Sequence, residues 1–316
     1  MRILLISDTH GNLDIINELI NKTNSSLVIH AGDFGFYDEL SYKHVSAREL
    51  FLLISHSPYW REYNVSKSTS RDILIKIVKK HSLLGTFSEY LNQIKNFKVP
   101  VYAVYGNHED IYVVRNLKKN NPINNLHLID EDNIYNLSND TSSPLQLFGI
   151  GGNFLKGKKL LDRQVSGRAG KIWCTLHQFG VLYNNLKRKS KPSIFVSHVS
   201  PGKEPLLAKL ISCYMPNIWV SGHMGSPHTC VWNQFAIRNM DESIEWFDSE
   251  LELLKALDTD KLTDEGKIAY NLIKKDLPKK DFWYKKLWNI NLPDVDMGYA
   301  VLVYVDEKFH VESYFL

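Results

Sequence analysis

The sequence predicts an α/β fold with a largely parallel sheet, and two observations support this prediction. First, five short apolar runs end abruptly in polar residues, often with a glycine; they lie at residues 3–6, 27–29, 99–104, 194–196 and 218–220. Continuous apolar runs of this length are typical of strands buried on both faces. Second, helical spacing of apolar residues occurs between several runs, as at residues 13–20. Strands that alternate with helices in this way usually form parallel sheets.

The length and composition of the chain bound its class. Its 316 residues allow one large domain or two small ones, because a domain usually takes about 100–200 residues. Hydrophobic residues make up 44% and charged residues 23%, which excludes a disordered or collagen-like chain. No apolar run approaches the ~18 residues of a membrane helix, and the first run is too short for a signal peptide. Three cysteines without a CxxC spacing indicate free thiols. We therefore expect a cytoplasmic protein that does not contact membranes.

The charge of the chain is unevenly distributed. The net charge is only +3, which does not by itself indicate a nucleic-acid partner. Residues 241–265, however, contain ten acidic and two basic side chains, so the rest of the chain is distinctly basic. An acidic run of this kind is most simply the solvated face of a helix. The alternative is a docking surface for a protein partner.

The segment 37–97 is the first of two expected insertions. It separates the second and third predicted strands by far more residues than one crossover helix needs. Helical patterns occur at 73–78 and 87–94, so we expect a helical insertion. It leaves directly from a strand end, which would place it near the mouth of a site at that edge of the sheet.

Three further segments complete the chain. Residues 120–143 are rich in Asn, Asp and Ser, which predicts turns around short strands. The stretch 241–292 carries leucines at helical spacing among acidic residues, so we expect an acidic helical addition that extends to residue 296. Residues 299–315 are typical of a closing β-hairpin.

Side chains that can bind metal follow all five apolar runs. They are Asp8, His10, Asp33, Asn107, His198 and His223. Ligands of parallel sheets bind beyond the carboxyl ends of the strands, so we expect these side chains to converge. Their mixed oxygen and nitrogen donors suit Mn, Fe or Zn better than Ca or Mg. Two such cations about 3.5–4 Å apart could share a carboxylate and hold a water, and the resulting metal-bound hydroxide could attack phosphorus.

Five motifs succeed one another in a specific order. They are Asp8-x-His10, Gly32-Asp33, Gly106-Asn107-His108-Glu109, His198 and Gly222-His223. Each piece alone occurs often by chance, but in this order, each after an apolar run, they resemble the calcineurin-like metallophosphoesterase superfamily. The resemblance runs from residue 1 to about 228 and includes the closing hairpin. It implies one elaborated domain over residues 1–316, a four-layer αββα sandwich of two mixed β-sheets flanked by helices.

The resemblance also implies two divalent metal ions and assigns their ligands. The first metal would be held by Asp8, His10 and Asp33. The second would be held by Asp33, which bridges, together with Asn107, His198 and His223. His108 would be a catalytic residue that contacts the phosphate and helps to protonate the leaving oxygen. An imidazole suits that role because its pKa lies close to neutral.

One ligand of the family pattern is missing. The family usually has Gly-His-x-His, and its last histidine completes the first metal site, whereas this chain has Gly222-His223-Met224-Gly225. Three alternatives remain open. Water or substrate takes the place and leaves a weaker site, His228 folds back to fill it, or the centre holds one metal or is degenerate.

A basic segment follows the glycine-rich stretch 149–153. Within it, Lys156, Arg163 and Arg168 are the candidates for binding substrate phosphate. The alternative is an ordinary solvated basic loop. No Lys-Ser/Thr follows the glycines, so the stretch is not a P-loop.

The resemblance predicts a hydrolase of phosphoric esters, and a small nucleotide-like phosphomonoester or phosphodiester is favoured as substrate. Two other functions stay open. The loss of a ligand at Gly225 and the acidic addition would fit a binding or scaffold module that keeps the fold without catalysis. The basic balance outside residues 241–265 would fit a nucleic-acid phosphodiesterase or nuclease, although the chain lacks the aromatic and basic stripe of single-strand binders.

Overall fold

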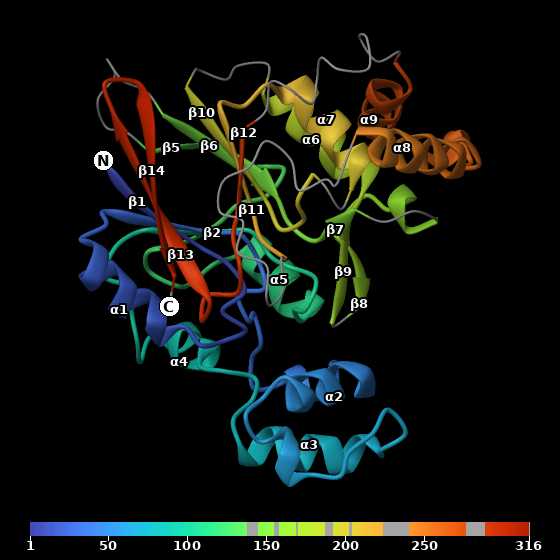
Figure 1. Cartoon of the computed structure of the whole chain (residues 1–316). Helices are drawn as coiled ribbons and strands as arrows, with labels where there is room; N and C mark the ends of the chain where they lie inside the picture. The colour runs from blue at the N-terminus through green and yellow to red at the C-terminus, as the bar shows by residue number, and fades with distance from the viewer. Residues whose placement is uncertain are drawn as a thin grey trace.

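The structure is a computed structural model that describes residues 1–137, 145–154, 158–168, 170–186, 192–201, 204–223, 240–275 and 288–315. Two mixed β-sheets stack face to face, and helices cover their outer faces (Figure 1). The mixed α/β fold class that the sequence predicted is therefore confirmed.

The first sheet has six strands among the described residues, in the order β14-β13-β1-β2-β3-β4. The bounds are β1 Arg2–Ile6, β2 Leu27–His30, β3 Val101–Ala103, β4 Leu126–Leu128, β13 Gly298–Val305 and β14 Lys308–Phe315. Strands β1 to β4 are parallel to one another, and β13 pairs antiparallel with both β1 and β14. The hairpin expected at 299–315 is thus β13 and β14.

The second sheet has five described strands, in the order β12-β11-β10-β6-β5. The bounds are β5 Tyr135–Asn136, β6 Gln146–Ile150, β10 Ser193–Ser197, β11 Ile218–Ser221 and β12 Trp288–Asn291. All neighbours are parallel except β5 and β6. A small third sheet, in the order β7-β9-β8, comprises β7 Asn153–Phe154, β8 Ser166–Arg168 and β9 Lys171–Cys174.

Apolar side chains fill the three spaces between the layers. Between the sheets, residues such as Ile3 and Leu5 of β1 pack with Val196 of β10 and Val220 of β11. The outer face of the first sheet packs against α1 Asp14–Thr23, α4 Phe87–Leu91 and α5 Ile111–Lys119. The outer face of the second sheet packs against α6 Leu176–Asn185, α7 Pro205–Tyr214, α8 Met240–Lys255 and α9 Asp264–Lys274. Short 3₁₀ turns lie at Lys158–Leu161 and Thr259–Lys261.

The segment 37–97 forms its own small helical cluster before it returns to the first sheet. It contains the 3₁₀ turns Ser41–Lys43 and Trp60–Glu62 and the helices α2 Ala47–Ser55, α3 Arg71–Lys80 and α4. Leu50 and Ile54 of α2 are buried against Leu74 and Val78 of α3. Figure 1 shows α2 and α3 side by side, apart from the two large sheets. The helical patterns at 73–78 and 87–94 correspond to α3 and α4, although α4 ends at Leu91.

Strand β12 corrects one expectation. We expected helices throughout 241–292, but Trp288–Asn291 is a strand parallel to β11. A hydrophobicity pattern does not show this strand, because its two asparagines are polar although both are fully buried. Asn289 donates hydrogen bonds to the carbonyl of Trp219 and to the hydroxyl of Ser221, and Asn291 accepts one from Ser221. These bonds satisfy the side-chain amide of Asn289 and the oxygen of Asn291, whereas Nδ2 of Asn291 is buried without a hydrogen-bond partner among the described residues. A polar sequence forms a buried strand here because most of its amide groups are hydrogen-bonded.

No helix within the described ranges is both long enough and apolar enough to cross a membrane.

Candidate metal centre

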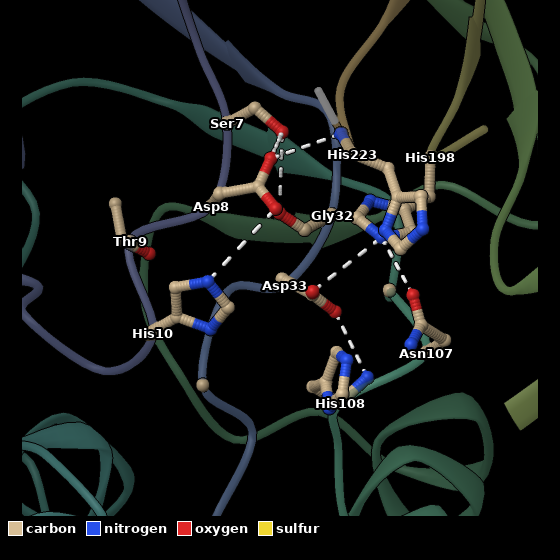
Figure 2. Close-up of polar contacts among 12 residues, drawn as sticks. Ser7, Asp8, Thr9, His10, Gly32, Asp33, Asn107, His108, His198 and His223 are labelled. Carbon is tan, nitrogen blue, oxygen red and sulfur yellow. Dashed lines mark hydrogen bonds and ion pairs between the residues drawn. The ribbon is translucent and has the colours of Figure 1, made fainter. Parts of the chain in front are cut away.

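The predicted ligands converge where the carboxyl ends of the two sheets meet (Figure 2). Asp8 and Asp33 follow β1 and β2 of the first sheet, and His198 and His223 follow β10 and β11 of the second. Asn107 lies a few residues beyond β3. Parallel strands end at the same edge, so the side chains that follow them come together.

The backbone turns sharply at these strand ends. Asp8, His10, Asp33 and His223 all have left-handed φ angles, of 55°, 47°, 50° and 57°. Asp and His adopt this conformation more readily than most residues other than glycine, and backbone strain often occurs at functional sites.

His198 is fully buried and its two ring nitrogens have distinct partners. Nδ1 lies 2.9 Å from the carbonyl oxygen of Ala31, to which it donates. This bond leaves Nε2 facing Oδ1 of Asn107 at 3.0 Å and Oδ2 of Asp33 at 3.5 Å. Burial lowers the pKa of His198, but the nearby carboxylates outweigh burial and raise it to about 9. Nε2 therefore points a proton, or in its place a metal ion, toward these oxygens.

The two buried aspartates differ in their surroundings. Burial opposes the ionisation of Asp33, but the charge of His198 holds the pKa of Asp33 well below its usual range. Oδ1 of Asp33 accepts a hydrogen bond of 2.9 Å from the backbone N–H of His108. Burial raises the pKa of Asp8. Oδ2 of Asp8 accepts hydrogen bonds from the hydroxyl of Ser7 and, at 3.1 Å, from the backbone N–H of His223.

At this centre, two groups of donor atoms have the spacing that a metal ion needs. In each group the ligand atoms lie within 4.8 Å of one another. The first group is Asp8, Asp33, His198 and His223, and the second is Asp8, His10 and Asp294. Carboxylates and imidazoles that converge in this way fit Mn, Fe or Zn. Asp8 belongs to both groups, whereas the resemblance assigns the bridge to Asp33; that assignment stays a prediction.

Asp294 is a member of the second group that sequence reasoning missed. It lies three residues beyond β12, and its carboxylate is partly exposed. Burial and the charge of Asp8 raise the pKa of Asp294 to about 6. The sequence carries no clear signal for Asp294, because residues 290–292 are Ile-Asn-Leu rather than a continuous apolar run.

His108 is held by a carboxylate from the segment 37–97. Nδ1 of His108 lies 2.7 Å from Oε1 of Glu49, on α2, and the Glu49 side chain is only 5% exposed. Burial lowers the pKa of His108, but its hydrogen bond to Glu49 and the charge of Asp33 raise it to about 9. The hydroxyl of Tyr37 donates to the backbone carbonyl of His108. No motif in the sequence pointed to Glu49, because its contact depends on how α2 packs.

Glu109, the last residue of the Gly-Asn-His-Glu motif, holds the loop that follows Asp33. Its fully buried carboxylate accepts backbone hydrogen bonds from Phe34 at 2.8 Å, Gly35 at 3.2 Å and Gly106 at 3.2 Å, and a further one from Phe36. Burial and the charge of Asp33 raise the pKa of Glu109 to about 8, while these N–H donors favour its ionised form. Glu109 thus fixes Asp33 relative to Asn107 and His108.

The four remaining predicted site residues are His228, Lys156, Arg163 and Arg168. His228 and Lys156 lie outside the described residues. Arg163 and Arg168 are exposed. Strand β9 hydrogen-bonds to the carbonyl of Asn107 through the N–H of Ile172, at 3.2 Å, which brings the β8–β9 hairpin that carries Arg168 alongside the motif. Substrate binding by Arg163 and Arg168 stays a prediction.

Fold and site together define a class of protein: an α/β sandwich with an Asp/His cluster, able to hold metal, between the carboxyl ends of its two sheets. Residues 1–227 match the family model described as calcineurin-like phosphoesterase. The chain belongs to that family, and the resemblance predicted from its motifs is confirmed. No curated protein matches the chain. Members of the family typically bind divalent metals and hydrolyse phosphoester bonds, although some are inactive.

Proposed function

We propose that the protein is a metal-dependent hydrolase that uses two divalent ions, such as Mn²⁺, on a small nucleotide-like phosphomonoester or phosphodiester. The observation that supports this proposal most is the convergence of Asp8, Asp33, His198 and His223, whose ligand atoms lie within 4.8 Å of one another. His108 lies next to this cluster, since its backbone N–H donates to Asp33.

The side chains divide into those that would hold metal and one that would handle a proton. Bound divalent ions would supply positive charge for the phosphate and lower the pKa of the attacking water. His108 would donate a proton to the leaving oxygen, and its raised pKa keeps that proton available at neutral pH. Glu49 would orient the ring through Nδ1, which leaves Nε2 for the substrate.

Removal and return of metal tests the proposed function. Dialysis of the whole chain against EDTA should abolish hydrolysis of p-nitrophenyl phosphate and bis-p-nitrophenyl phosphate, and Mn²⁺ should restore it. The comparison of the two esters separates monoesterase from diesterase activity. Failure of the metal-loaded chain to hydrolyse any ester in a broad panel would contradict the proposal.

Glu49→Gln should weaken catalysis and shift its pH dependence. The charge of Glu49 helps to raise the pKa of His108, so its removal should lower that pKa. The fall in kcat/KM that accompanies loss of the His108 proton should then begin at lower pH. For a fall of about one pKa unit we expect roughly a twofold loss at pH 8, which should grow toward tenfold at about pH 10, where His108 is mostly deprotonated in both chains.

The matched control for this prediction is Glu62→Gln, an exposed glutamate in the same segment. It should leave the pH profile unchanged. A Glu49→Gln profile that superimposes on the wild-type profile would show that Glu49 does not act through His108.

Location and partners are extensions of the same proposal. We propose a cytoplasmic location, with which the free thiols of Cys174 and Cys213 are compatible. The acidic segment 241–265 packs Phe247 and Leu254 against the second sheet's outer layer and exposes Glu245, Asp248 and Glu252. This arrangement favours a solvated face, and docking of a protein partner there remains the alternative.

A further inference from the structure

The segment between β12 and β13 crosses from one sheet to the other beside the metal centre. Strand β12 runs parallel to β11, with Ser221 opposite Asn291. The N–H of Leu292 donates to the carbonyl of Ser221 at 2.8 Å, so the chain leaves β12 directly beside Gly222-His223. Strand β13 then begins at Gly298 and pairs with β1, the strand that precedes Asp8. The crossing segment, residues 292–297, therefore spans the carboxyl edge of both sheets.

Buried neighbours fix Asp294 within this crossing. Leu292 is fully buried in the core between the sheets, and Val295, which is 3% exposed, packs in the core on the outer side of the first sheet. The carbonyl of Asp294 accepts a hydrogen bond of 2.9 Å from the N–H of Met297, which closes a turn. Asp294 thus lies on an anchored segment, with its side chain free to project toward the site.

The carboxylate of Asp294 completes a three-residue donor set. One oxygen of Asp294, one oxygen of Asp8 and one ring nitrogen of His10 lie within 4.8 Å of one another. Ligand atoms at about 2.1 Å from an octahedral ion lie roughly 3–4 Å apart, so one ion could bind all three after small adjustments. Asp8 is shared with the group that contains His198 and His223, so the two donor sets are adjacent.

The charges of the donor set Asp8, His10 and Asp294 also favour the binding of a cation. Two carboxylates face one another, and a nearby like charge disfavours ionisation of both. The imidazoles of His10, whose Nε2 lies 3.9 Å from Oδ1 of Asp8, and of His198 offset only part of the negative charge of the two carboxylates. A divalent ion between them would remove the repulsion.

We propose that Asp294 is a ligand of the first metal and takes the role of the histidine that Gly225 replaces. This inference rests on the metal dependence of the proposed function. The sequence left three alternatives open for the ligand that Gly225 lacks, and this is a fourth. A carboxylate from another loop supplies the ligand in place of water or His228. A carboxylate is a harder donor than imidazole and adds a negative charge, so the first site should favour Mn²⁺ over Zn²⁺ more than a histidine-completed site does.

Binding of Mn²⁺ to the metal-free whole chain, measured by equilibrium dialysis and calorimetry, tests this proposal without any assay of activity. Asp294→Asn should weaken one Mn²⁺ site by at least about tenfold and spare the other, since even outer partners of metal ligands change affinity by about 10–100-fold. Asp296→Asn is the matched control, because Asp296 is exposed in the same crossing segment and belongs to neither donor set. It should bind Mn²⁺ like the wild type.

A third variant and a stability measurement separate a ligand from a structural residue. Asp294→His should retain the site and shift its preference from Mn²⁺ toward Zn²⁺. Thermal unfolding of metal-free Asp294→Asn should occur at or above the wild-type temperature, because the substitution removes a repelling charge. A lower unfolding temperature of metal-free Asp294→Asn, together with no recovery of metal binding in Asp294→His, would overturn the proposal in favour of a structural role.

The remaining outcomes distinguish failure of the Asp294 proposal from failure of the proposed function. Unchanged Mn²⁺ binding by Asp294→Asn, or equal losses in Asp294→Asn and Asp296→Asn, would overturn the role of Asp294 and leave the proposed function standing. A wild-type chain that binds no Mn²⁺, Fe²⁺ or Zn²⁺ would overturn both.

Discussion

Asp33→Asn is expected to abolish measurable phosphoester hydrolysis while the chain stays folded. The Asp33 carboxylate faces Nε2 of His198 at 3.5 Å and accepts the N–H of His108 at 2.9 Å. Asparagine keeps an oxygen for the backbone N–H of His108 but removes the negative charge that would bind metal. We expect a loss of more than about 100-fold in Mn²⁺ affinity, since removal of outer partners alone costs about 10–100-fold. The rate should fall further, because the charge of Asp33 also helps to raise the pKa of His108.

The measurement combines kcat/KM for an aryl phosphate ester with Mn²⁺ binding to each chain. Asp248→Asn provides the matched control, since Asp248 is exposed on α8. It should change neither quantity. Asp33→Asn that keeps more than a tenth of the wild-type rate would show that Asp33 is not a metal ligand on which catalysis depends.

Much of the fold could be predicted because its strands are buried on both faces. Apolar runs such as residues 3–6 and 194–196 have no polar face, which is typical of strands in a sheet covered on both sides. Strand β12 follows a different rule, since the buried side chain of Asn289 and the side-chain oxygen of Asn291 are satisfied by Ser221 and the backbone of β11. Such satisfaction depends on the neighbouring strand, so the local sequence does not show it.

The residues of the candidate site likewise differ in whether the local sequence could predict them. Asp8, Asp33, His198 and His223 each follow their own strand, so local pattern and parallel topology together predicted that they converge. Glu49 reaches His108 only because α2 folds back on the motif, and Asp294 reaches Asp8 only because the chain crosses between the sheets. Both contacts are set by long-range packing. They have no characteristic spacing in the sequence.

Gly106→Ala is expected to disrupt both the fold near the site and metal binding. A Cβ atom at Gly106 would lie 1.9 Å from Oδ1 of Asp33 and 2.2 Å from its backbone nitrogen. Backbone cannot move aside cheaply here, because Glu109 ties the loop after Asp33 to the N–H of Gly106. Overpacking of a dense interior costs about 1–3 kcal/mol and sometimes more, so we expect a loss of about 3 kcal/mol in the free energy of unfolding. Chemical denaturation measures it.

Metal binding distinguishes this variant from one that is merely less stable. Displacement of Asp33 should weaken Mn²⁺ binding in Gly106→Ala even at temperatures where the chain is fully folded. Gly266→Ala is the control, because a Cβ in the first turn of α9 would meet the flexible Cδ2 of Leu262 at 3.2 Å. Alanine is favoured over glycine in helices by up to about 1 kcal/mol, so Gly266→Ala should be neutral or stabilising. Wild-type stability and Mn²⁺ affinity in Gly106→Ala would mean that Gly106 and Asp33 do not meet as closely as the structure places them.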